Sequence, residues 1–468
     1  MTTSASSPRT ITVTPSTGAV ELTRRPGRWI DGWNPEDETF WQSQGRAIAR
    51  RNLGWSIFAE FLGFIIWQLW SIVVVMLPAA GFTLSTSESF WLISLPSLVG
   101  ATLRFPYTFA VARFGGRNWT IISAALLLIP AVLLGIVVGD PDTPFWMLLV
   151  VAALGGVGGG NFASSMSNIT YFFPRREKGW ALGLNAAGGN LGTSVAQFCV
   201  PVVVTIGAGA TLNISWAGWM WIPLILLSIW GAARYMDNLS SAKADVSASA
   251  AALREPHLWV LALLYIGTFG SFIGFASVFP KLIADQFPAW STIQVGQAAI
   301  SLAFLGALVG SLARPYGGRL ADRFGGARVT VVAFAAMAGG ALALLVTLPQ
   351  ADFALYLLCF LVLFTATGVG NGSTYRMIPS VFHARALASP DAGDLDASRR
   401  KAAAALGLIS AIGAYGGFLV PQILNASQAA TGGYSAAFLG FVVGYAVLLV
   451  LTLAVYAVPR RALAGERI

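Results

Sequence analysis

About twelve apolar runs, each about 20 residues or more in length, follow one another along this chain of 468 residues. Each run is long enough to cross a bilayer as a helix, because the hydrocarbon core is about 30 Å thick. Inside lipid, backbone N–H and C=O groups must pair within their own segment, which favours helices. Only 10% of the residues are charged, whereas soluble proteins average about 25%. The sequence therefore predicts an all-α polytopic membrane protein with about twelve transmembrane helices.

An internal repeat relates the two halves of the chain. Nine residues recur unchanged at a constant offset of 210 positions. The first copy is Leu95, Leu98, Val99, Gly100, Arg104, Arg113, Phe114, Gly115 and Gly116, and the second is Leu305, Leu308, Val309, Gly310, Arg314, Arg323, Phe324, Gly325 and Gly326. This repeat predicts two equivalent six-helix bundles, at residues 54–236 and 257–460.

Three polar segments flank and separate these bundles. Residues 1–53 are predicted to form an N-terminal tail, 237–256 a linker and 461–468 a C-terminal tail. Up to about residue 28 the N-terminal tail is rich in Ser, Thr and Pro, which predicts disorder. Asn34 then predicts a helix N-cap. The apolar and basic residues that follow predict an amphipathic helix on the membrane face, with an ordinary solvated helix as the alternative.

Lysine and arginine are concentrated in one set of loops. These loops share a side with both tails and with the linker, whereas the opposite loops hold Lys281 and almost no other basic residue. Basic loops remain in the cytoplasm, so both termini and the linker are predicted to be cytoplasmic. We expect a monomer in the cytoplasmic membrane of a bacterium. The net charge of +9 follows from this topology and gives no reason to expect a nucleic acid partner.

A lone arginine interrupts an apolar run in each copy of the repeat. Arg104 and Arg314 each precede a basic Arg-Phe-Gly-Gly turn by nine residues, so in a helix each lies about 13 Å from that turn. Both would then lie near the middle of the bilayer, where ionisable side chains are costly and indicate function. Two guanidiniums that face one cavity predict a binding site for a small anion.

Longer motifs resemble a known family. The turn at residues 318–326 resembles the conserved loop between the second and third helices of each half in the major facilitator superfamily. Residues 179–191 and 407–418 resemble the two signature segments of the nitrate/nitrite porter family, and residues 161–166 and 264–275 are similar to its bacterial NarK-type branch. The resemblance runs from about residue 30 to the end of the chain and implies the major facilitator fold.

The resemblance also implies six residues that bind nitrate or nitrite. They are Arg104 and Arg314 as a clamp, Asn190 and Tyr265 as hydrogen-bond partners, and Phe162 and Phe269 as a sandwich around the plane of the anion. Nitrate is flat and monovalent, and a planar guanidinium fork matches its oxygens better than an ammonium does. Taken alone, the residue types of the tyrosine and the two phenylalanines favour core packing instead.

Two transport mechanisms fit these residues. An arginine does not release its proton at physiological pH, so an empty carrier would have to move two uncompensated buried charges. This favours exchange of nitrate for nitrite. Symport of nitrate with a proton is the alternative, and it needs a titratable group. The candidate is Glu60, early in the first apolar run, for which an ion pair with Arg50, Arg51 or a loop arginine is the other interpretation.

Other classes of function fit less well. Paired arginines would also suit an organic-anion exchanger, but the expected aromatic sandwich and short pocket argue against one. A nitrate sensor would need a signalling domain, and the tails are too short for that. The sequence shows no cluster of metal ligands, nucleophile–base pair or phosphate-binding loop, so we expect neither enzyme activity nor a metal or cofactor.

Overall fold

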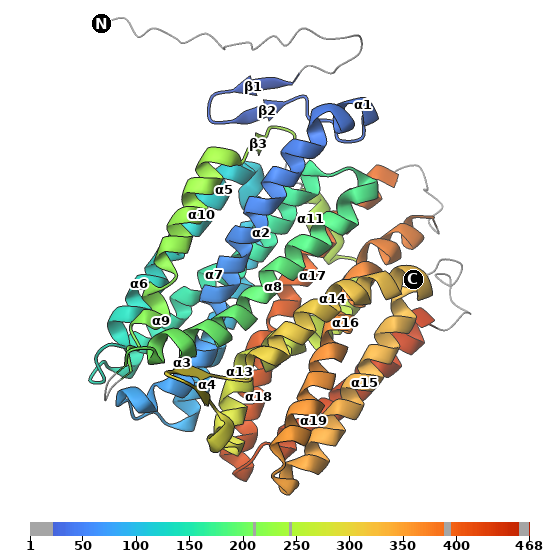
Figure 1. Ribbon diagram of the computed structural model, residues 1–468. Coiled ribbons are helices and arrows are strands. Elements are labelled where there is room, and N and C mark those ends of the chain that lie inside the picture. The colour runs from blue at the N-terminus through green and yellow to red at the C-terminus, as the bar shows by residue number, and fades with distance from the viewer. Residues whose placement is uncertain (1–21, 209–211, 243–245, 388–394, 458–467) are drawn as a thin grey trace, which may run out of the picture.

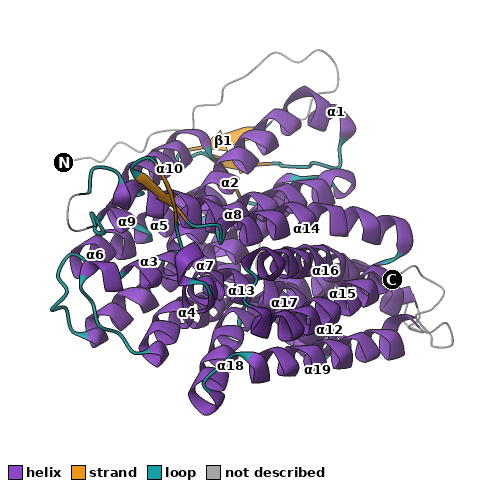
Figure 2. Cartoon of the chain, turned by 60° about the horizontal axis from the view of Figure 1, so that its bottom comes forward, coloured by secondary structure: helices purple, strands orange, loops and turns teal. Residues whose placement is uncertain are grey.

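The computed structural model describes residues 22–208, 212–242, 246–387, 395–457 and 468. Long helices run side by side through the molecule, and the few strands are short (Figures 1 and 2). In Figure 1 most first-half helices lie on the left and most second-half helices on the right. The predicted disorder of residues 1–21 and most of the predicted C-terminal tail lie outside the described residues.

The first half is built from α1 to α10, and strands β1 and β2 precede it. The bounds are β1 (Thr23–Arg25), β2 (Trp29–Asp31), α1 (Glu38–Phe40), α2 (Arg46–Gln68), α3 (Trp70–Met76), α4 (Thr86–Phe114), α5 (Gly116–Leu126), α6 (Leu128–Val137), α7 (Phe145–Phe172), α8 (Arg175–Thr205), α9 (Trp216–Trp219) and α10 (Ile222–Tyr235).

The linker carries β3 (Asn238–Leu239) and α11 (Val246–Leu253), and the second half follows. Its bounds are α12 (Pro256–Tyr265), α13 (Ser271–Gln286), β4 (Ile293–Val295), β5 (Ala298–Ile300), α14 (Phe304–Phe324), α15 (Gly326–Thr347), α16 (Phe353–Leu387), α17 (Leu395–Ala414), α18 (Gly416–Thr431) and α19 (Ser435–Thr452). Short π-helical segments occur at Trp41–Gly45, Ile266–Gly270 and Leu453–Ala457, and 3-10 turns at Pro78–Ala80, Pro288–Trp290 and Leu348–Gln350.

Ten helical segments among the described residues are long and apolar enough to cross a membrane. The other two predicted spans correspond to α4 and α14, which are 29 and 21 residues long. These two helices are less apolar, and they carry Arg104 and Arg314. Ten of the twelve predicted spans therefore meet the length and hydropathy expected of a membrane span, and the two arginine-bearing helices stand at the positions of the other two.

The repeat is visible in the backbone at the ends of these two helices. The residue that caps the end of α4 is Gly115, with φ 87°, and the residue that caps the end of α14 is Gly325, with φ 94°. Both residues lie in the region of positive φ that glycine adopts without strain. Each donates its N–H to the carbonyl four residues earlier, Val111 or Ala321, at 2.9 Å. The matching sequences therefore form matching turns.

The N-terminal region differs from the prediction. Glu38–Met76 is one continuous helical segment of 39 residues, so the amphipathic residues extend the first span instead of forming a separate surface helix. Asp37, and not Asn34, is the N-cap, because its side chain accepts from the N–H of Phe40 at 3.0 Å. Residues 22–28, predicted to be disordered, lie in a hairpin whose strands β1 and β2 pair antiparallel.

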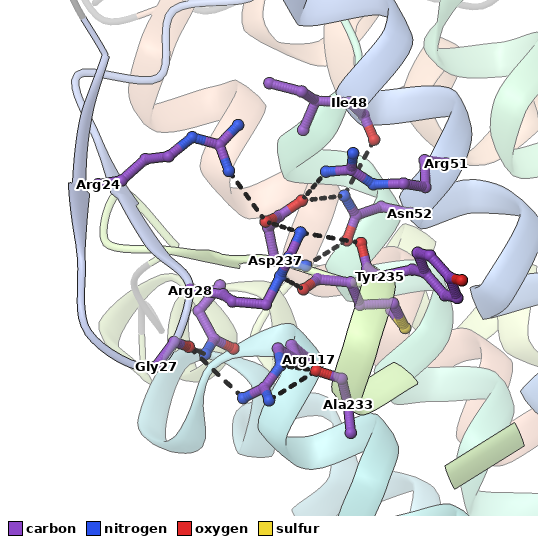
Figure 3. A network of polar contacts seen from close by, with 12 residues as sticks. Arg24, Gly27, Arg28, Ile48, Arg51, Asn52, Arg117, Ala233, Tyr235 and Asp237 are labelled. Carbon is purple, nitrogen blue, oxygen red and sulfur yellow. Dashed lines mark hydrogen bonds and ion pairs between the residues drawn. The ribbon is translucent and has the colours of Figure 1, made fainter. Parts of the chain in front are cut away.

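This hairpin is fixed at one end of the bundle, which we call the linker end, by strand pairing and by buried charge. β2 pairs in parallel with β3 of the linker. Asp237, just before β3, is fully buried and contacts Arg24, Arg28 and Arg51 (Figure 3). The tail, the first long helix and the linker therefore meet at one carboxylate, although they are about 200 residues apart in sequence.

Helices of the two halves pack against each other through α3 and α13, α8 and α14, and α4 with α17 and α18. Polar bonds join the halves toward the opposite end of the bundle, which we call the far end. The amide of Gln197 donates to the carbonyl of Ala276 at 2.7 Å, and the hydroxyl of Ser194 donates to the carbonyl of Phe304 at 3.0 Å. Gln422 of α18 donates to Ser94 of α4 at 2.7 Å. These bonds tie the two halves together toward the far end.

Candidate functional site

Arg104 of α4 is fully buried and links the two halves of the protein. Its Nε donates to the carbonyl of Gly159 in α7 at 3.0 Å. Its Nη1 donates to the carbonyl and to the hydroxyl of Ser410 in α17, each at 3.0 Å. Its Nη2 is buried without a partner among the described residues. One charged N–H group is therefore left to bind something else.

Arg314 of α14, the repeat equivalent of Arg104, is 5% exposed and is held more loosely. Its Nη2 donates to the hydroxyl of Tyr265 at 3.4 Å, which is a long bond. Its Nη1 is buried and has no partner among the described residues. Buried polar groups are normally paired, and each exception needs an explanation. A bound anion would explain both arginines.

Phe162 of α7 and Phe269, in the π-helical segment after α12, bring the two arginines together. The two rings stack with centroids 6.0 Å apart and planes 26° apart. The Arg104 guanidinium carbon lies 4.6 Å from the centroid of Phe162 and 5.1 Å from that of Phe269. The corresponding distances from Arg314 are 5.5 and 5.9 Å. Both guanidiniums thus converge on one aromatic pair.

The spacing of these rings bears on the predicted sandwich. An atom layer between two rings needs about 3.5 Å on each side, or about 7 Å in total. Because the centroids of Phe162 and Phe269 are 6.0 Å apart, an anion does not fit between them in this conformation. A sandwich would require the rings to separate by about 1 Å, so the role of the two rings stays a prediction that this conformation does not test.

Asn190 and Glu60 lie deep in the first half. Asn190 is fully buried, and both polar atoms of its amide lack a partner among the described residues. The preceding residue, Gly189, faces the Glu60 carboxylate, which a Cβ on that glycine would approach to 2.5 Å. Among the described residues no hydrogen bond joins Asn190 to either arginine, so its proximity to the anion site stays a prediction.

The structure rejects one interpretation of Glu60. Its side chain is fully buried and accepts from the amide of Asn185 at 2.6 Å. It also interacts with Ser165 and, electrostatically, with Arg314 and Arg104. The alternative of an interfacial ion pair with Arg50 or Arg51 is wrong, because Arg51 binds Asp237 and Arg50 is exposed. Glu60 therefore belongs to the charged centre of the protein.

Three residues at this centre were not predicted. Ser410 accepts from Arg104, the ring of Trp67 lies 5.2 Å from the same guanidinium carbon, and the ring of Tyr375 lies 5.6 Å from that of Arg314. The repeat offers a signal for Tyr375, because it is 210 positions after Ser165, which interacts with Glu60. Ser410 lies inside the signature-like segment 407–418 but could not be given a role there.

A cavity of about 850 Å³ leads from the linker end toward these residues. Its inner wall includes Phe162, Tyr375 and Ser410. Around its outer part lie four basic or titratable side chains, Arg175, Lys178, His383 and Arg400. Basic residues at a mouth raise the local concentration of anions. Neither Arg104 nor Arg314 lines the cavity, so the aromatic side chains separate the arginines from it.

Comparison with known proteins identifies the family. The family model of the Major Facilitator Superfamily matches residues 59–421. The chain is 41% identical over 449 residues to the nitrate/nitrite transporter NarU of Salmonella typhimurium, covering 91% of this chain and 96% of that protein. It is 37% identical over 440 residues to the probable nitrate/nitrite antiporter NarK2 of Thermus thermophilus, covering 90% and 94% of the two chains.

Solved structures agree on the fold. The inward open xylose transporter XylE from E. coli is similar with a TM-score of 0.61 at 14% identity, over 85% of this chain and 94% of that one. These relatives are named as transporters and not as enzymes. The chain therefore belongs to the major facilitator superfamily and, within it, to the family of NarK-type nitrate/nitrite transporters.

Proposed function

We propose that this protein carries nitrate and nitrite across the membrane by alternating access, with the anion held between Arg104 and Arg314. One observation carries the proposal. Two buried arginines from equivalent helices converge on the same aromatic pair, and each keeps an N–H group without a partner among the described residues. The names of the relatives indicate the anions.

The geometry suits a small planar anion better than a carboxylate with an organic substituent. The guanidiniums are enclosed by the rings of Trp67, Phe162, Phe269 and Tyr375, so a substituent would have to displace an aromatic side chain. A nitrate ion can accept from both arginines at once through different oxygens. The organic-anion exchanger is therefore the weaker candidate.

Exchange of nitrate for nitrite is the mechanism that we propose. Both arginines remain charged, and an empty carrier would have to change conformation with their repulsion only partly offset. A bound anion supplies the missing charge and the missing hydrogen-bond acceptor. The loaded carrier should therefore switch faster than the empty one, which couples outward movement of one anion to inward movement of another.

Symport of nitrate with a proton is the second candidate, because of the position of Glu60. Its buried carboxyl interacts electrostatically with both arginines. The carboxylate and nitrate are alternative ways to offset the same positive charge. A carrier that binds nitrate would then take up a proton with it and release the two together.

Counterflow in proteoliposomes distinguishes the two mechanisms. Exchange predicts rapid nitrate uptake when nitrite is trapped inside and no proton gradient is present, and slow uptake into empty vesicles. Symport predicts uptake into empty vesicles that a proton gradient accelerates and that Glu60→Gln abolishes. Arg104→Lys and Arg314→Lys test the clamp itself, because they keep the charge and remove the fork. We expect each to reduce uptake at least about tenfold, and near-normal uptake would exclude the clamp.

We further propose that the protein lies in the cytoplasmic membrane of a bacterium as a monomer, with the linker end facing the cytoplasm. The basic side chains of the linker end support this orientation. In that orientation the cavity opens inward while the far end is closed. A cysteine placed in β1 should then react with an impermeant thiol reagent only after the membrane is opened.

A further inference from the structure

A second cavity lies on the outer surface of the second half, away from the arginine site. It has a volume of about 750 Å³ and is lined by residues of α14, α15 and α16, which lie together at the right of Figure 1. Its lining is aliphatic and aromatic apart from Arg328 and Thr365. Several walls are well exposed, including Val332 at 67%, Leu358 at 57% and Phe324 at 50%. We call this feature the α15 groove.

The internal repeat shows that the α15 groove is particular to the second half. At the offset of 210 positions, Val329 of the groove corresponds to Trp119 in the first half. Trp119 stacks on Phe114 with centroids 5.5 Å apart and contacts Tyr107 edge-on at 4.9 Å. In the second half, a valine stands where the first half has this tryptophan, and a glycine, Gly317, where it has the tyrosine. Gly317 itself packs against the backbone of Val369, which a Cβ would approach to 2.2 Å, so the difference that bears on the groove is the valine in place of the tryptophan.

The charge at the mouth of the groove differs in the same way. Arg328 lies in the first turn of α15, at the linker end, and is exposed. It forms no hydrogen bond or ion pair with any described residue. Its counterpart, Asn118, is engaged, because its Oδ1 accepts from Arg117 at 2.9 Å and from Asn238 at 3.2 Å. Within the part of the chain that the structure describes, Arg328 is thus a cation without a hydrogen bond or ion pair beside an apolar groove, whereas its first-half counterpart is a neutral, engaged asparagine.

The dimensions match one leaflet of a bilayer. Along α15 the wall runs from Arg328 to Ala336, eight residues or about 12 Å in a helix. Half of a hydrocarbon core is about 15 Å. An arginine at the helix end would lie at the level of lipid phosphates, and the apolar wall would lie at the level of the acyl chains.

We propose that the α15 groove binds one anionic phospholipid from the surrounding bilayer, with an acyl chain in the groove and the phosphate on Arg328. Charge complementarity favours this occupant over a neutral lipid. The open position at Val329 favours a flexible chain over the flat surface that a protein partner presents. The proposal does not rest on the proposed anion transport, since the lining of the groove includes none of the residues proposed to bind the anion.

Lipid binding to the full-length protein tests the proposal directly. Phosphatidylglycerol or phosphatidylcholine is titrated into delipidated protein, and bound lipid is counted by native mass spectrometry. For the unaltered protein we expect one phosphatidylglycerol that is retained more strongly than the rest, and no such preference for phosphatidylcholine.

Three variants copy first-half residues into the second half, and a fourth serves as a control. Arg328→Asn should lower the affinity for phosphatidylglycerol about fivefold, the effect of one interfacial arginine. Val329→Trp should remove the retained lipid altogether by filling the groove. Ala336→Leu, which copies Leu126 of the first half, fills the groove less and should weaken retention; it replaces the tryptophan variant if that variant does not fold. Arg113→Asn removes an exposed arginine at the same end of the first half and should leave binding unchanged.

Three outcomes would overturn the proposal. Equal losses from Arg328→Asn and Arg113→Asn would show that surface charge alone holds the lipid. Unchanged retention in both groove-filling variants would show that the lipid lies elsewhere. A dimer in lipid nanodiscs that Val329→Trp disrupts would instead identify a second copy of this chain as the occupant, and would also refute the lipid site.

Discussion

The buried carboxylate of Asp237 provides a quantitative test of what fixes the N-terminal hairpin to the bundle (Figure 3). It accepts from Arg28 at 2.8 Å, from Arg51 at 2.6 Å and from the amide of Asn52 at 3.1 Å. Asp237→Asn keeps the size of the side chain and removes its charge. Hydrogen bonds between charged groups contribute about 1.5–3 kcal/mol each. The two arginine side chains are 27% and 37% exposed, so we discount each bond to about 1 kcal/mol, or about 2 kcal/mol in total.

A loss of about 2 kcal/mol should lower the melting temperature of the detergent-purified protein by about 4 °C, since large domains lose about 2 °C per kcal/mol. Asp31→Asn is the matched control in the same hairpin. Asp31 pairs with Arg25 at 2.6 Å, but the two side chains are 35% and 50% exposed, so the pair contributes at most about 1 kcal/mol. Hydrogen exchange at residues 23–31 should accelerate in the Asp237 variant alone. Equal melting temperatures and equal exchange in the two variants would show that strand pairing alone holds the hairpin.

Two substitutions test the packing around the site. Gly189→Ala places a Cβ 2.5 Å from the carboxylate of Glu60, so nitrate uptake in proteoliposomes should fall at least about tenfold. Gly183→Ala is the control, because open space surrounds that residue, and it should leave uptake unchanged. Similar uptake by both variants would show that Glu60 is not needed for transport. Gln197→Leu removes the hydrogen bond to the carbonyl of Ala276 at the far end, which contributes about 1 kcal/mol. Labelling of a cysteine placed in the far-end interface should therefore rise about fivefold. Unchanged labelling would mean that this bond does not hold the far end closed.

The fold could be predicted because the signals were local or repeated. Membrane-spanning helices follow from apolar runs of sufficient length, and the paired turns at Gly115 and Gly325 follow from identical sequences. The N-terminal hairpin could not be predicted in this way. Its strands are three residues long, lack an apolar alternation, and gain their stability from β3 and Asp237, about 200 residues away. Contacts of that range leave no periodic trace in the sequence.

The candidate site divides along the same line. Arg104 and Arg314 could be singled out because charge inside an apolar run is unusual wherever it occurs. Ser410 could not, because its contribution to Arg104 includes a backbone carbonyl, which every residue has. The role of Glu60 was undecided for a related reason: the sequence gives its depth along the helix, whereas only the structure gives the side of the helix that faces Asn185.

The two arginines are held unequally, and this difference bears on how a carrier with fixed positive charges changes conformation. Arg104 donates to Gly159 in its own half and to Ser410 in the other half. If the halves rock, the first bond persists and the bonds to Ser410 must break. Each buried N–H left without a partner costs about 1–3 kcal/mol, and more when charged. Glu60 and its partner Asn185 both belong to the first half and move together with Arg104. The position of Glu60 relative to Arg104 therefore stays the same when the halves rock, and Glu60 does not take the place of Ser410. An anion that binds Arg104 supplies an acceptor and a negative charge together. The hydrogen bonds and the charges therefore lead separately to the same expectation, that the empty carrier faces the higher barrier.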